Sequence, residues 1–314
     1  MSQAKKAPSA TTTIAFVVVL CFVCAAILAT LAAGLKELQG SAAALDRAKQ
    51  MLMSAKLFHP DGYFLLDEGK ENYVPAKLAE QNGRLVKGDR SDIADADAIF
   101  TVYNKRIIPF LVDAEGKETT FQAAGIDLKT YLEDYRKTGY DNQPLKLVYR
   151  ILSNPAEGQA PSNDKVDGYI FHISGFGLWD AIYGYLAVAK DGDTVIGISW
   201  YEHKETPGLG ANIAEPSFQS HFPGKKIFQS SPTGKTDFAR APLGITVVRG
   251  LVSDVYPSGP KAESAVDGMA GATLTGNGVT KAYKDTLASY RPFLLRLVEA
   301  SSNDSGSAAP NGSA

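Results

Sequence analysis

The sequence predicts an α+β protein, in which one N-terminal transmembrane helix precedes an exported domain with a mostly antiparallel sheet flanked by helices. Three observations lead to this prediction. No charged residue occurs between Lys6 and Lys36. Short runs of β-forming residues, two of them joined by a hairpin signal, occupy the centre of the chain. Segments with helical spacing lie on both sides of these runs.

The N-terminal apolar stretch is long enough to cross a membrane. Residues 14–35 read IAFVVVLCFVCAAILATLAAGL and are interrupted only by Thr30 and Gly34. About 20 apolar residues span the hydrocarbon core of a bilayer as a helix, whereas the apolar part of a cleaved signal peptide has about 7–15. We therefore predict a transmembrane helix over 14–35 that stays in the mature protein.

The charges beside this helix predict its orientation. Lys5 and Lys6 precede it, while Lys36 and Glu37 cancel each other after it. Because basic flanks stay in the cytoplasm, we expect residues 1–13 inside the cell and the main domain outside. The sequence thus predicts a single-pass protein of the bacterial inner membrane with its domain on the periplasmic side.

Composition excludes several classes of function. The 32 basic and 34 acidic side chains give a net charge of -2, which argues against a nucleic-acid partner. Both cysteines, Cys21 and Cys24, lie in the apolar stretch, so the exported part has no disulfide and no cysteine-ligated metal. That pair is more typical of small packing residues than of a redox site, although contact with a partner subunit stays open. We predict no metal site, since His203 and His221 are more typical of surface or hydrogen-bonded histidines.

The remaining elements follow in chain order. Residues 36–58 show helical spacing and predict a juxtamembrane helix, whereas 59–100 give no clear pattern. A helix is expected over 126–137, and strands over 145–152, 168–174, 184–190, 194–201 and 244–254. The sequence Asp191-Gly192-Asp193 predicts a hairpin between two of these strands. A last helix is expected over 278–299, interrupted near Pro292, so that 59–300 form one domain and 301–314 a disordered tail.

Several common catalytic motifs are missing. The Gly-x-Gly triplets lack the third glycine or alanine of a dinucleotide-binding fingerprint, so the chain has no sign of its own NADH site. No zinc-peptidase or α/β-hydrolase motif occurs either. Two glycine-rich segments remain, over 203–210 and 267–276, and the second opens onto the last predicted helix. Such a loop exposes backbone N–H groups that bind phosphate, but by spacing alone its threonines are better explained as turn or helix-capping residues.

The second segment resembles the flavinylation motif of the FMN-binding domain family, Asp-Gly-x-x-(Ser/Ala)-Gly-Ala-Thr. The matching residues are Asp267, Gly268, Ala270, Gly271, Ala272 and Thr273. Serine is commoner in the family where Ala270 stands. The resemblance implies that FMN is bound covalently, through a phosphoester to the side-chain oxygen of Thr273.

A wider resemblance, clear over 166–228 and 267–298, is to a family of FMN-bearing subunits of the sodium-translocating NADH:quinone oxidoreductases. It is carried by residues 175–180, Tyr183-Gly184 and the stretch 203–210. Together the two resemblances imply that further residues surround the FMN: Leu178, Trp179, Glu205, Thr206, Leu209, Gly210, Asp267, Gly271, Ala272, Leu274 and Thr275. Without the resemblance, Trp179 is equally typical of a core tryptophan.

The resemblance implies a one-electron carrier subunit of an oxidoreductase complex that pumps Na⁺, with no complete site for NADH or quinone in this chain. It also implies other subunits, membrane lipid and an FMN transferase as partners. Two alternatives stay open. One is the equivalent FMN subunit of an ion-translocating ferredoxin:NAD oxidoreductase complex, and the other is a membrane-tethered structural module without a cofactor.

Overall fold

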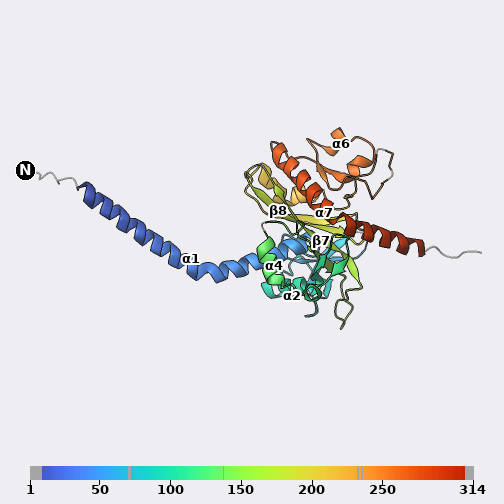
Figure 1. Ribbon diagram of the computed structural model, residues 1–314. Helices are drawn as coiled ribbons and strands as arrows, with labels where there is room; N and C mark the ends of the chain where they lie inside the picture. The colour runs from blue at the N-terminus through green and yellow to red at the C-terminus, as the bar shows by residue number, and fades with distance from the viewer. Residues whose placement is uncertain (1–8, 70–71, 137, 232, 235, 308–314) are drawn as a thin grey trace, which may run out of the picture. The chain divides into compact units, whose positions relative to one another are not determined.

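The computed structural model describes residues 9–69, 72–136, 138–231, 233–234 and 236–307. The chain divides after Asp46 into two compact units. The first contains most of helix α1 (Ala10–Ser54), and the second contains the last turns of α1 together with the sheets and other helices (Figure 1).

Helix α1 is uninterrupted across the predicted transmembrane and juxtamembrane segments. Its apolar residues between Ile14 and Leu35 are exposed, as expected for side chains that face lipid. Among the described helices it is the one long and apolar enough to cross a membrane, judged by length and composition. The predicted N-terminal apolar helix is therefore confirmed. Of the expected cytoplasmic segment, residues 10–13 already belong to α1, and residues 1–8 lie outside the described part of the chain.

The second unit is built on a six-stranded antiparallel sheet with strand order β5-β4-β6-β7-β8-β9. Its strands are β4 (Ile107–Val112), β5 (Glu118–Thr119), β6 (Lys146–Leu152), β7 (Val166–Phe176), β8 (Ala181–Ala189) and β9 (Val195–Glu202). The strands predicted over 145–152, 168–174, 184–190 and 194–201 are confirmed. The predicted hairpin joins β8 to β9, and Gly192 takes the positive φ of 73° that its turn requires.

Helix α7 (Thr273–Ser307) covers one face of this sheet (Figure 1). Its aromatic side chains pack edge-on against the strands: Tyr290 against Phe171, Phe293 against Phe110, and Tyr283 against Trp200. The buried Tyr290 hydroxyl donates a 2.9 Å hydrogen bond to the carbonyl of Leu147. This interface is the largest part of the hydrophobic core, and it fixes where α7 begins.

The opposite face is covered by α2 (Ala96–Arg106), α4 (Leu128–Tyr135), the short α3 (Phe121–Ala124) and the last turns of α1 (Figure 1). Ala48 and Leu52 of α1 are buried, as the predicted stripe requires. The helix predicted over 126–137 is confirmed as α4, except that residue 137 lies outside the described residues. His172 lies among tyrosines on this face, where burial lowers its pKa to about 3 and its ring bonds the Tyr201 hydroxyl at 2.9 Å.

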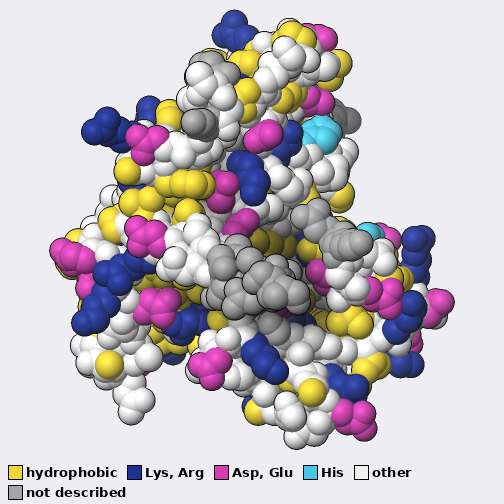
Figure 2. Space-filling model, turned by 90° about the vertical axis from the view of Figure 1, so that its right-hand side faces the viewer, with side chains coloured by type: hydrophobic (Ala, Val, Ile, Leu, Met, Phe, Trp, Pro, Cys, Tyr) yellow, Lys and Arg dark blue, Asp and Glu magenta, His cyan; other side chains and the backbone are white. Residues whose placement is uncertain are grey.

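The segment without a clear sequence pattern forms a small antiparallel sheet of β1 (Phe64–Asp67), β2 (Tyr73–Leu78) and β3 (Leu85–Lys87). Basic and acidic side chains alternate over the face of the molecule shown in Figure 2. That face does not present the basic stripe typical of nucleic-acid-binding proteins.

Two predictions near the C-terminus are wrong. Of the strand expected over 244–254, only β10 (Thr246–Val247) forms, paired in parallel with β11 (Ala265–Val266). After it the backbone bonds to a loop instead of a strand, since Val252 N–H donates to Asp267 and Gly268 N–H to the Gly250 carbonyl. The elements between β9 and α7 are otherwise short: η1 (Gly210–Ala214), α5 (Pro216–Gln219), α6 (Val252–Val255) and η2 (Pro260–Ser264). Residues 301–307 are helical rather than disordered, and 308–314 lie outside the described residues.

Replacing Gly278 by alanine is expected to destabilise the second unit. A Cβ on Gly278 would lie 2.2 Å from the Phe176 carbonyl oxygen, so α7 would have to move away from the end of β7. We expect Gly278→Ala to lower the free energy of unfolding by about 1–3 kcal/mol, as overpacking does, in thermal or denaturant unfolding of the full chain in detergent. The neighbouring exposed variant Asn277→Ala is the control, and equal effects of the two would contradict the close packing.

Candidate functional site

Three loops meet at one edge of the large sheet. We call residues 176–180, between β7 and β8, the first loop, and residues 203–210, after β9, the second loop. Because β7, β8 and β9 are antiparallel, the end of β7, the start of β8 and the end of β9 share this edge. Residues 267–272, the third loop, lead into α7, whose first turns pack against the end of β7 through Gly278.

The buried carboxylate of Glu205 joins the three loops. Its Oε1 accepts hydrogen bonds from the backbone N–H groups of Leu178 and Trp179, at 2.9 and 3.0 Å. Its Oε2 accepts one from the hydroxyl of Thr275, at 2.5 Å. Glu205 is 5% exposed and Thr275 1% exposed. One side chain of the second loop therefore holds the first loop and the start of α7 together.

Glycines make room for this carboxylate. A Cβ on Gly177 would lie 2.4 Å from Glu205 Oε1, and one on Gly210 would lie 2.5 Å from both Glu205 Oε2 and Thr275 Oγ1. In the third loop, Gly271 has a positive φ of 73°, and its missing side chain leaves space against Leu209. The glycines are thus required by close approach and by backbone conformation.

Two further contacts connect the first and second loops. The indole N–H of Trp179 donates to the Thr206 hydroxyl at 3.1 Å. Lys204 forms an ion pair with Asp180, and its hydrogen bond lowers the pKa of the Asp180 carboxyl. Trp179 is nevertheless 68% exposed, so it belongs to the surface and not to the core.

The two threonines at the start of α7 differ in their surroundings. Thr273, the first residue of the helix, is half-buried, whereas the Thr275 hydroxyl is enclosed and bonded to Glu205. The N–H groups of a helix's first turn have no partner within the helix and lie at the positive end of its dipole. Thr273 therefore places a hydroxyl beside donors that suit a phosphate group.

A cavity of about 380 Å³ opens beside Thr273. Its walls are residues 247–251, which follow β10, the third loop and the first turn of α7. Arg249 is the basic side chain of this lining and Asn277 contributes an amide. The cavity thus combines a cation, small residues and helix N–H groups around one hydroxyl.

Exposed apolar side chains surround the same edge of the sheet. They come from the first and second loops, the segment after β10 and the first turn of α7: Phe176, Leu178, Trp179, Leu209, Leu251 and Leu274. Leu274 is 60% exposed although it belongs to the first turn of the helix that completes the core. Apolar surface of this kind typically marks a ligand or partner site.

The structure brings most of the residues predicted for the site together. Leu178, Trp179, Glu205, Thr206, Gly210 and Thr275 are linked by the contacts above, and Leu209 lies against Gly271. Ala272 is buried directly before Thr273, and Asp267 braces the Gly250–Val252 backbone instead of facing the other loops. Sequence reasoning missed Phe176, Arg249, Leu251 and Asn277. Arg249 and Leu251 lie in the stretch wrongly predicted as strand, which hid their position.

The comparisons with known proteins agree with this site. Residues 177–288 match the FMN-binding domain family. The corresponding subunit, NqrC, of the Na(+)-translocating NADH-quinone reductase of Chlamydia caviae is 40% identical over 272 residues, which cover 84% of this chain and 85% of that protein. NqrC of Vibrio vulnificus is 30% identical, with 91% of this chain and 94% of that protein covered. A crystal structure of NqrC from Parabacteroides distasonis is 25% identical, with a TM-score of 0.49 over 83% of this chain and 96% of that one.

Removing the Glu205 carboxylate is expected to loosen all three loops. Glu205→Ala leaves two backbone N–H groups and one hydroxyl without their acceptor, which costs about 3 kcal/mol of unfolding free energy. The fluorescence of Trp179 should change as well, because its backbone is held by Glu205. The control is Glu215→Ala, an exposed carboxylate whose side chain caps no helix. Unchanged stability and fluorescence in Glu205→Ala would contradict the role of this carboxylate.

Proposed function

Since the chain belongs to the NqrC family, subunits of the Na(+)-translocating NADH-quinone reductases, we propose that it carries electrons through FMN esterified to Thr273. The observation that carries this proposal is the position of Thr273: a half-buried hydroxyl at the first residue of α7, beside a cavity lined by Arg249. The match of residues 177–288 to the FMN-binding domain family supports the identity of the cofactor.

The choice of Thr273 over Thr275 is supported by the surroundings of each hydroxyl. Thr275 is 1% exposed and donates its hydroxyl proton to Glu205. A phosphoester at Thr275 would displace this bond and bring a second negative charge against a buried carboxylate, which is unfavourable. Thr273 has no such neighbour among the described residues, and its oxygen lies where phosphate oxygens meet the N–H groups of the helix start.

The residues present fit the other parts of FMN. The N–H groups of α7 and the Arg249 guanidinium provide donors for the phosphate. Small residues of the third loop leave room for a ribityl chain, and Trp179, Leu178 and Leu209 offer apolar surface to a flat ring. When bound, FMN supplies one-electron redox chemistry, while the protein orients and tunes it. The ester keeps the cofactor in place at any free FMN concentration.

This subunit is an electron carrier between other subunits rather than a complete enzyme. The chain lacks a dinucleotide-binding motif, so NADH oxidation belongs to another subunit of the complex. Quinone reduction and Na⁺ transport are likewise properties of the assembled complex. Attachment of FMN requires a separate transferase in the compartment that holds the domain.

Helix α1 anchors the chain in the bacterial inner membrane, in contact with lipid. The basic residues Lys5 and Lys6 before the span keep the N-terminus in the cytoplasm. The domain with the FMN and its transferase then both lie on the periplasmic side.

The attachment residue is tested by flavin fluorescence on a denaturing gel. The chain produced with its transferase and exported should give a fluorescent band, and Thr273→Val should give none, since the ester oxygen is lost. Thr275→Val is the matched control: it should stay fluorescent but unfold more easily, because Glu205 loses a hydrogen bond. Fluorescence that survives Thr273→Val but disappears in Thr275→Val would overturn the assignment, and a dark exported wild type would favour a structural module.

The topology is tested by a reporter enzyme fused after Glu299. A reporter that is active only in the periplasm should be active, and one that is active only in the cytoplasm should be silent. Replacing Lys5 and Lys6 by glutamate should lower the periplasmic signal, because the positive flank is removed. The reverse pattern for the wild type would place the domain in the cytoplasm.

A further inference from the structure

A second, larger cavity lies at the far end of the sheet from the FMN site. Its volume is about 1180 Å³, and it is lined by residues around the start of β7, the β8–β9 hairpin, β1 and the C-terminal part of α7. Asp167 of this cavity and Phe176 of the first loop are nine residues apart on β7, hence separated by about 30 Å at about 3.3 Å per residue. The cavity is therefore separate from the proposed FMN site.

The lining is rich in charge. It contains five basic side chains, Lys56, Arg106, Arg150, Lys165 and Lys190, and four acidic ones, Asp67, Glu118, Asp164 and Asp167. Arg150 pairs with Glu118 and stacks on the Phe110 ring, so this pair neutralises itself. Four cations and three carboxylates remain to be accounted for.

Arg106 at the base of the cavity is incompletely paired. It is 2% exposed, and its Nε donates to the Leu152 carbonyl at 2.9 Å. Its Nη2 lies 3.5 Å from the Asp167 carboxylate, at the limit of a hydrogen bond, while its Nη1 is buried without a partner among the described residues. Burial lowers the pKa of Arg106 to about 10, and Asp167 only partly opposes this. A buried guanidinium with an unmet donor is destabilising unless an anion compensates it.

The lysines of the cavity also lack anionic partners. Within the described part of the chain, no carboxylate forms an ion pair with Lys56, Lys165 or Lys190. Lys56 is half-buried, and this burial lowers its pKa. Lys165 and Lys190 are exposed at the rim. Three ammonium groups therefore surround a space whose base is a buried guanidinium.

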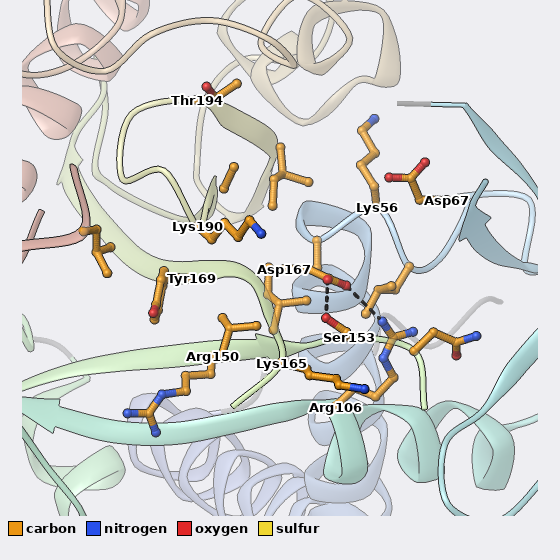
Figure 3. Close-up of a pocket in the computed structure, with 18 of the residues that line it drawn as sticks. Lys56, Asp67, Arg106, Arg150, Ser153, Lys165, Asp167, Tyr169, Lys190 and Thr194 are labelled. Atoms are coloured by element: carbon orange, nitrogen blue, oxygen red, sulfur yellow. Dashed lines mark hydrogen bonds and ion pairs between the residues drawn. The ribbon is translucent and has the colours of Figure 1, made fainter. Parts of the chain in front are cut away.

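Figure 3 shows how these groups are arranged. The side chains of Lys190 and Arg106 extend toward Asp167 from two sides, whereas Arg150 points away from them. Asp167 also accepts a hydrogen bond from Ser153, and half of its side chain is exposed. Asp167 thus occupies one side of Arg106 and opposes any anion that approaches the same guanidinium.

We propose that this cavity binds a small organic anion through a phosphate or carboxylate group, with Arg106 at its base and Lys165 and Lys190 at its rim. Arginine with flanking lysines is a common arrangement for such groups. The volume exceeds what an inorganic ion fills and lies in the range of small-molecule sites. The buried arginine favours a small molecule over an acidic segment of another subunit, because an unmet donor at the base requires a group that reaches deep into the cavity.

The test titrates pyrophosphate, and separately citrate, into the full-length protein in detergent and measures binding by calorimetry. Wild type should bind at one site. Arg106→Gln should bind about tenfold more weakly, since a charged hydrogen bond is lost. Asp167→Asn should bind several-fold more tightly, because the competing carboxylate becomes neutral without a change of shape. Lys105→Ala, an exposed cation adjacent in α2 and outside the cavity, should bind like wild type.

The opposite responses of Arg106→Gln and Asp167→Asn distinguish a site from general attraction to a charged surface. If Arg106→Gln does not fold, the double variant Lys165→Ala/Lys190→Ala replaces it, since both lysines are exposed, and should weaken binding by a similar factor. The absence of binding of either probe up to about 10 mM overturns the proposal, as does equal binding by the wild type and the cation variants. Protection of Lys190 from an amine reagent in the intact complex, without any probe, would assign the cavity to a partner subunit instead.

Discussion

The carboxylate of Glu205 is the contact on which the geometry of the FMN site depends. Loops have little structure of their own, and these three loops come from distant parts of the sequence. A charged acceptor buried among two backbone N–H groups and one hydroxyl gives them a fixed separation. Its burial is tolerated because all three of these bonds are made, and the absence of any one would leave a buried charge partly unmet. The site is therefore rigid where it is polar.

The second constraint is the packing of α7 on the sheet. The helix begins at Thr273 because the third loop ends there, and it cannot slide, since its aromatic residues fill fixed positions against β4, β7 and β9. Gly278 lets the first turns reach the end of β7. The position of the Thr273 hydroxyl is thus set by the core of the domain, even though the residue itself lies at the surface.

Much of the fold could be predicted from the sequence, because period-two strands, a hairpin turn and a long apolar helix have strong local signals. The strand expected over 244–254 failed because its apolar residues pack one at a time against α7 and the third loop, without a strand partner beyond Val247. Residues 59–100 had no clear pattern because their strands are short. The site residues were predicted by resemblance to a motif, whereas the link from Glu205 to Thr275, 70 residues away, is tertiary and has no local signal.

The ring of exposed apolar residues around Thr273 has a consequence for the life of the protein before its cofactor arrives. Phe176 and Trp179 are 74% and 68% exposed, and neighbouring leucines extend the same surface. A newly made chain with this edge uncovered is prone to self-association, since water is released when two such edges meet. The order of maturation then matters for colloidal stability: a flat cofactor or a partner that covers the edge early keeps the domain soluble while the complex assembles.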